Sequence, residues 1–69
     1  MNNLTERELE VLKYLLIGLN NKEISEKTVT TVHTVKAHLT SIMKKLSVTN
    51  RTAAVYKAIK NKIVDIDEN

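Results

Sequence analysis

The chain has 69 residues, of which 42% are hydrophobic, one is glycine and none is proline or cysteine. This composition excludes disulfides and thiolate metal sites, argues against disorder and against a strand-and-turn fold, and predicts one small all-α domain over residues 1–69. The net charge of +3 suits a polyanionic partner, although an excess of this size is common in proteins that bind no nucleic acid.

The first helix is expected over residues 5–18. The segment Leu4-Thr5-Glu6-Arg7-Glu8 has the form of a capping box, in which the third amide of the helix donates to Thr5 and Glu8 reaches back. After it, leucines recur at helical spacing and form an apolar stripe that consists of Leu9, Leu12, Leu15, Leu16 and Leu19. Gly18, the only glycine, predicts the end of this helix.

A second, short helix is expected over residues 21–27. Asn20 and Glu23 repeat the capping-box pattern, and Leu19 and Ile24 are spaced to pack against each other across the first turn. The next four residues, 28–31, are β-branched and poor helix formers, so they predict a turn.

The third and fourth helices are expected over residues 32–46 and 51–61. In the third, apolar residues follow an i, i+3, i+7 pattern over four turns and define a buried side that consists of Val32, Val35, Leu39, Ile42 and Leu46. Thr31 and Asn50 are suitable N-caps, and the fourth helix carries Ala54, Val55, Ala58 and Ile59. A short capped helix, a turn and a longer helix together predict a helix-turn-helix over about residues 19–40.

The opposite side of the third helix is polar and carries no acidic residue. At about 100° per residue, this side carries His33, Ala37, Thr40, Ser41 and Lys44, and Lys36 flanks it. No Asp or Glu occurs between Thr28 and Asn50, whereas exposed helices ordinarily mix both signs of charge. A merely solvated face is the alternative, but a surface without acids favours an anionic partner. The major groove admits one α-helix, and lysine can donate there to guanine.

The motifs together resemble the LuxR-type, or GerE-like, helix-turn-helix family. The matching residues run without gaps from about Leu4 to Val64 and consist of Leu4-Thr5, Arg7-Glu8, Val11-Leu12, Gly18, Asn21-Lys22-Glu23-Ile24, Thr34-Val35-Lys36, His38, Ile42, Lys45-Leu46, Asn50-Arg51 and Ala54-Val55. The resemblance implies a bacterial transcription regulator that binds double-stranded DNA with its third helix in the major groove. It also implies homodimer contact through the fourth helix, and transcription control makes RNA polymerase a candidate partner.

The site residues follow from this resemblance and from the helical wheel. Those expected to read bases are Lys36, Ala37 and Thr40, to which the wheel adds His33. Those expected to contact phosphates are Asn21, Lys22, Thr31, Thr34, Lys44 and Lys45. The predicted dimer seam consists of Tyr56, Ile59 and Ile63. Glu8 and Arg51 are expected to tie the first helix to the start of the fourth.

The sequence departs from the family pattern at four positions. Thr28 and Thr30 stand where larger aliphatic residues are usual, so the turn is expected to be less well packed. Val32 replaces a commonly polar residue and is expected to join the core. Lys62 occupies a usual glycine position, which leaves the end of the fourth helix open.

Other functions are less well supported. His33 and His38 point about 140° apart on a helix, no Ser-His-Asp spacing stands out, and so small a chain has little room for a pocket, so we expect no catalytic residue, metal or cofactor. The serious alternative is a protein-interaction module whose apolar patch consists of Tyr56, Ile63, Val64 and Ile66. This patch could also be the dimer seam, and salt dependence separates the two functions.

The sequence favours a cytoplasmic protein that makes no membrane contact. No apolar run approaches the roughly 18 residues that a membrane span requires, and the N-terminal residues lack the basic-then-apolar pattern of a signal peptide. Because no segment resembles a sensor, we expect either a stand-alone regulator or the effector end of a longer one.

Overall fold

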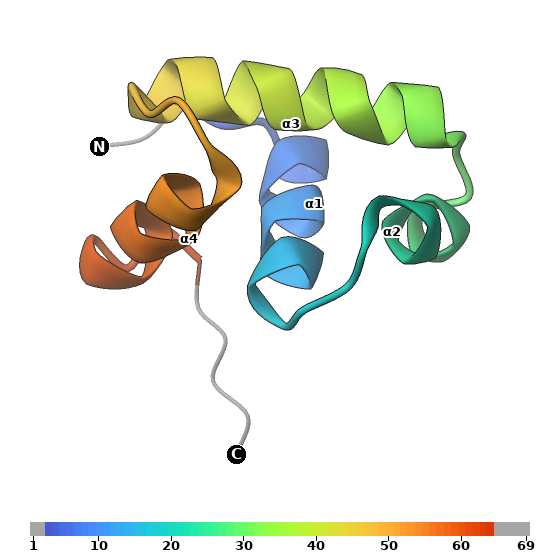
Figure 1. Ribbon diagram of the computed structural model, residues 1–69, viewed down its shortest axis with the longest axis horizontal. Helices are drawn as coiled ribbons and strands as arrows, with labels where there is room; N and C mark the ends of the chain where they lie inside the picture. Colours follow the sequence, from blue (N-terminus) through green and yellow to red (C-terminus); the bar gives the residue numbers. More distant parts are fainter. Residues whose placement is uncertain (1–2, 65–69) are drawn as a thin grey trace.

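The computed structural model describes residues 3–64 and forms four helices there, α1 (Glu6–Leu16), α2 (Asn21–Thr28), α3 (Val32–Leu46) and α4 (Arg51–Lys60). α3 extends along one side of the molecule, and α1, α2 and α4 all pack against its other side (Figure 1). The all-α prediction is confirmed. α3 has the predicted bounds, α2 and α4 each differ from expectation by one residue at the end, and α1 is shorter by one residue at its start and by two at its end. Within residues 3–64, no helix is long and apolar enough to cross a membrane.

Every helix begins directly after the cap residue that the sequence predicts. The Glu8 amide donates to the Thr5 hydroxyl at 3.1 Å, and the Thr5 amide donates to the Glu8 carboxylate at 2.9 Å. Asn20 and Glu23 form the same reciprocal pair at the start of α2. The caps of α3 and α4 are Thr31 and Asn50. These local bonds satisfy amides that have no acceptor inside a helix, and they fix where each helix starts.

The four helices also end in a common way. After each, one residue adopts a left-handed conformation and the next amide donates back to a carbonyl in the last turn, as the Leu19 amide does to Tyr14 at 3.1 Å. The left-handed residues are Gly18, Val29, Ser47 and Lys62. Only the first is a glycine, so the absence of glycine after α4 does not prevent the same ending.

Val29 is the most strained of these residues, and its replacement by glycine is expected to stabilise the fold. Its φ is 55° and its side chain is 89% exposed, so it suffers the left-handed penalty of a β-branched residue without compensating burial. We expect Val29→Gly to raise the free energy of unfolding by about 0.5 to 1 kcal/mol in urea denaturation, after the entropic cost of glycine. Val29→Ala keeps the Cβ atom and should change stability less; a less stable glycine variant would contradict the assignment.

The core is built around the buried side of α3. Its members are Val11, Leu12, Ile24, Val35, Leu39, Ile42, Leu46, Ala54 and Ala58. The predicted stripe of α3 is therefore correct except at Val32, which is 36% exposed because it lies in the first turn, beyond the cover of the other helices. In α1 the leucine stripe is only partly correct, since Val11 and Leu12 are fully buried while Leu15 and Leu16 are half-buried.

Candidate nucleic-acid interface

α3 exposes one continuous side to solvent. The structure brings together on it all four residues that the sequence predicts to read bases, His33, Lys36, Ala37 and Thr40, and each of them is exposed. Lys44 is also exposed one turn further on. No other helix covers this side of α3 (Figure 1). An α-helix whose exposed side carries small and cationic side chains is compatible with the width of the major groove.

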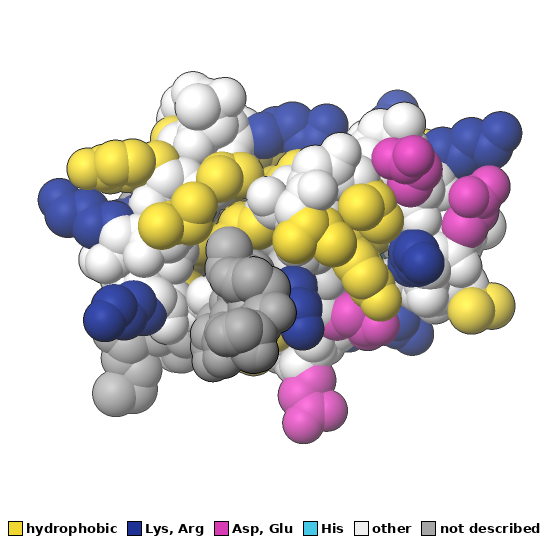
Figure 2. Space-filling model, turned by 90° about the horizontal axis from the view of Figure 1, so that it is seen from below, with side chains coloured by type: hydrophobic (Ala, Val, Ile, Leu, Met, Phe, Trp, Pro, Cys, Tyr) yellow, Lys and Arg dark blue, Asp and Glu magenta, His cyan; other side chains and the backbone are white. Residues whose placement is uncertain are grey.

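Charge is segregated between this surface and the rest of the molecule. Within residues 3–64 every acidic residue belongs to α1 or α2, and α3 and α4 carry none. Figure 2 shows the side away from α3, where Asp and Glu side chains are mixed with Lys and Arg. The exposed side of α3 therefore repels a polyanion less than the opposite side does.

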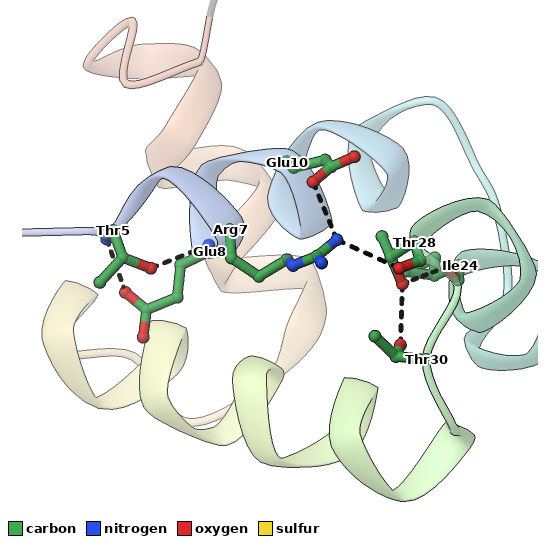
Figure 3. Close-up of polar contacts among 7 residues, drawn as sticks. All are labelled: Thr5, Arg7, Glu8, Glu10, Ile24, Thr28 and Thr30. Atoms are coloured by element: carbon green, nitrogen blue, oxygen red, sulfur yellow. Dashed lines mark hydrogen bonds and ion pairs between the residues drawn. The ribbon is translucent and has the colours of Figure 1, made fainter.

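Hydroxyl groups hold the turn that leads into α3. Thr28 is 4% exposed, and its hydroxyl donates to the Ile24 carbonyl at 2.8 Å while the Thr30 hydroxyl lies 2.8 Å away (Figure 3). The Arg7 guanidinium of α1 donates to the Thr28 carbonyl at 3.2 Å. Two of these hydrogen bonds are local to the turn, and the third, from Arg7, links it to α1. The expectation of a less well packed turn stays a prediction.

A buried carboxylate joins α1 to α3. Glu8 is 5% exposed, and its two oxygens accept from Lys45 Nζ at 2.8 Å and from the Ser41 hydroxyl at 2.7 Å. Two expectations are therefore wrong: Glu8 does not pair with Arg51, and Ser41 is half-buried against α1 and does not lie on the open side of α3. Lys45 Nζ also donates to the Asn3 carbonyl at 3.3 Å, so its ammonium has two partners in the protein.

The pKa of Glu8 reflects these contacts. Burial alone would raise it, but hydrogen bonds from Lys45, Ser41 and the Thr5 amide, together with the charge of Lys45, lower the pKa from 4.5 to about 2. Glu8 is therefore ionised near neutral pH, and it acts as an electrostatic tie between the two helices.

The residues predicted to contact phosphates lie in the first turn of α2, at the start of α3 and in the last turn of α3. Lys22 is exposed in the first turn of α2, where the helix amides lack intrahelical acceptors. At the start of α3, the hydroxyls of Thr31 and Thr34 lie 3.1 Å apart and the cap accepts from the Thr34 amide. Lys44 and Lys45 are both exposed, and the Lys45 ammonium is in addition bound to Glu8.

Arg51 is a candidate contact that sequence reasoning missed. Its guanidinium donates to Asn21 Oδ1, so it joins the start of α4 to the start of α2 and not to α1. The same two residues line a shallow hollow of about 280 Å³ together with Lys36, Leu39, Thr40 and Met43. The cap at Asn50 placed Arg51 at the start of a helix, but no local pattern revealed which helix it faces.

The predicted dimer seam is only partly open. Tyr56 and Ile59 of α4 are 64% and 54% exposed, and Lys60 Nζ lies 5.7 Å from the centre of the Tyr56 ring. Ile63 and Val64 pack against the core instead. Ile66, which belongs to the alternative apolar patch, lies outside the described residues.

No metal-binding cluster is present within residues 3–64, because nowhere in that range do three His, Asp or Glu side chains converge. His33 is exposed on the open side of α3, and His38 is half-buried on a different side of the helix.

Comparison with known proteins gives consistent matches over nearly the whole chain. Residues 2–58 match the family described as "Bacterial regulatory proteins, luxR family". The transcriptional regulatory protein LiaR of Bacillus subtilis (strain 168) is 46% identical over 63 residues, which cover 91% of this chain and 30% of LiaR. LnrK of the same organism, also described as a transcriptional regulatory protein, is 58% identical over 55 residues, or 78% of this chain and 25% of LnrK. The chain thus spans less than a third of these relatives.

The fold is also similar to solved structures. The structure of the transcription factor GerE has a TM-score of 0.84 and 28% sequence identity, and the match covers 93% of this chain and 96% of GerE. The response regulator ChrA of a heme-sensing two-component system has a TM-score of 0.86 and 39% identity, with 93% of this chain and 32% of ChrA covered. The match therefore covers almost the whole chain of the GerE structure.

Proposed function

Because the chain belongs to the LuxR family of bacterial regulatory proteins, we propose that it binds a specific sequence of double-stranded DNA and thereby regulates transcription in the cytoplasm. In this proposal α3 lies in the major groove. The observation that carries the proposal is the acid-free, exposed side of α3. It presents two hydrogen-bond donors, the ammonium of Lys36 and the imidazole of His33, and two small side chains, Ala37 and Thr40. The side of the molecule away from α3 mixes both charges and lacks this character (Figure 2).

Each residue on this side has a chemical role in the proposal. Lys36 donates to the O6 and N7 acceptors of guanine, while Ala37 and Thr40 touch thymine methyl groups and His33 donates to a base edge. The residues that position the backbone are Asn21, Lys22, Thr31, Thr34 and Lys44. We assign Lys45 a structural role, since Glu8 already holds its ammonium.

Tight recognition requires two copies of so small a reading surface. We assign the homodimer contact to α4, where Tyr56 and Ile59 are exposed and apolar. A dimer of this kind places its two α3 helices about one turn of DNA apart, on a two-fold site. If the chain activates transcription, RNA polymerase is the candidate partner; repression by blocking a promoter would require no such contact.

Selection from random duplexes tests this function. We expect a preferred half-site to appear in pairs with two-fold symmetry and fixed spacing, and binding should weaken steeply as salt rises, because phosphate contacts release counterions. A preferred half-site that occurs only singly would contradict the homodimer. Binding that is insensitive to salt and sequence would instead favour a protein-interaction module.

The proposal separates two lysines by their effects. We expect Lys36→Ala to weaken binding to the preferred duplex by roughly 1 to 3 kcal/mol and to relax preference at one base pair. Lys22→Ala should weaken all duplexes about equally and lower the salt slope by about one. Titrations of preferred and scrambled duplexes measure both effects. A Lys36→Ala variant that binds the preferred duplex like the unaltered chain would remove Lys36 from the base-reading set.

A further inference from the structure

A polar-rimmed hollow lies beside the base-reading side of α3, where the first turns of α2 and α4 approach it. It measures about 280 Å³ and is lined by Asn21, Lys36, Leu39, Thr40, Met43 and Arg51. Leu39 is buried and Met43 half-buried, so they form an apolar floor, and the polar residues surround it. No carboxylate lines the hollow, and both charged residues at its rim are cations.

The charge of Arg51 is not neutralised within the described part of the chain. Its guanidinium donates to a neutral partner, the side-chain oxygen of Asn21, and neither it nor Lys36 belongs to an ion pair between residues 3 and 64. A guanidinium has five N–H donors in a planar fork, so most of them are free for another acceptor. The bond to Asn21 restricts the orientation of the fork, which lowers the entropic cost of binding a second ligand.

We infer that this hollow holds one backbone phosphate of the bound DNA, with Arg51 as its principal ligand. Two oxygens of one phosphate match the spacing of the N–H donors of the guanidinium. The negative charge of the phosphate is complementary to the two cations at the rim. Lys36 then reaches past the phosphate to a base edge. This inference rests on the proposed DNA binding, and it makes Arg51 a positioning residue that sets how far α3 enters the groove and which base pair Lys36 meets.

Single-phosphate replacement tests the inference directly. The probe is the selected duplex, prepared in a set in which one phosphate at a time is replaced by an uncharged methylphosphonate. We expect the unaltered chain to lose about 10-fold in affinity when one particular phosphate per half-site is neutralised. Arg51→Ala should lose about 10-fold on the unmodified duplex, lower the salt slope by about one per protomer, and become insensitive to replacement at that same phosphate.

Two further variants separate charge from structure. Asn21→Ala removes the hydrogen bond to Arg51 but keeps the cation, so it should retain sensitivity to the methylphosphonate; Lys13→Ala removes an exposed cation from α1 and should bind like the unaltered chain. Thermal melts report whether each variant folds.

The possible outcomes are distinct. If Arg51→Ala is folded and remains sensitive at every phosphate at which the unaltered chain is sensitive, the inference is wrong while the proposed function stands. If the unaltered chain shows no preferred duplex, the proposed function itself fails.

Discussion

Ala37→Glu is expected to lower affinity for the preferred duplex more than about 100-fold, or about 3 kcal/mol. Ala37 is exposed in the middle of the acid-free side of α3, so a carboxylate there would be carried into the groove between phosphates. It would lose part of its hydration without gaining a cationic partner on the DNA, and it would face phosphates of like charge. A fluorescence anisotropy titration with the selected duplex measures the loss.

Ala37→Gln is the matched control for this variant. Its side chain has nearly the same size and shape but carries no charge, so it should weaken binding much less than glutamate does. Because the position is exposed, the free energy of unfolding of both variants should lie within about 0.5 kcal/mol of that of the unaltered chain. If glutamine and glutamate lowered the affinity equally, the size of the side chain at this position would be the cause and its negative charge would not.

Glu8→Gln is expected to lower the free energy of unfolding by about 2 to 3 kcal/mol, a large part of the stability of so short a chain. The amide keeps the shape of the side chain but gives Lys45 no negative partner, at a position where the Glu8 side chain is buried and that of Lys45 is 31% exposed. Glu10→Gln is the control, since Glu10 pairs with Arg7 where both side chains are over 40% exposed, and its loss should cost under about 1 kcal/mol.

The same residue predicts a pH dependence with a definite sign. The pKa of Glu8 is about 2 in the folded protein and near 4.5 when unfolded, so its stabilising contribution is complete above pH 4.5 and disappears as the pH falls towards 2. The difference corresponds to about 3 kcal/mol. Urea denaturation between pH 2 and 6 should show this loss in the unaltered chain and a flatter profile in Glu8→Gln. Parallel profiles would place the cause in other carboxylates.

Local signals made the helices predictable from sequence. Each N-cap bond joins residues three apart, and the stripe of α3 reflects one helical period, so neither depends on the rest of the molecule. The end of α1 was less certain because Gly18 follows the cap residue and does not belong to the helix. The family resemblance added the arrangement of the four helices, which no local pattern contains.

Contacts between distant residues were not predictable in the same way. Glu8 and Lys45 are 37 positions apart, and Arg51 and Asn21 are 30 apart, so their pairing depends on how the helices cross. The helical wheel placed Ser41 on the open side of α3 because a wheel contains no information on which side a neighbouring helix covers. The exposure of Val32 has a similar cause, since period alone does not reveal where the cover of a helix ends.

α3 meets each of the other three helices on one side and none on the other. Its outward positions can therefore be exchanged as a set while the inward ones stay constant, so under the proposed function the domain would be a scaffold for retargeting to new DNA sequences. Under the same proposal, a cavity opened beneath α3 would tilt the helix and weaken its discrimination between DNA sequences even though every outward side chain remained unchanged.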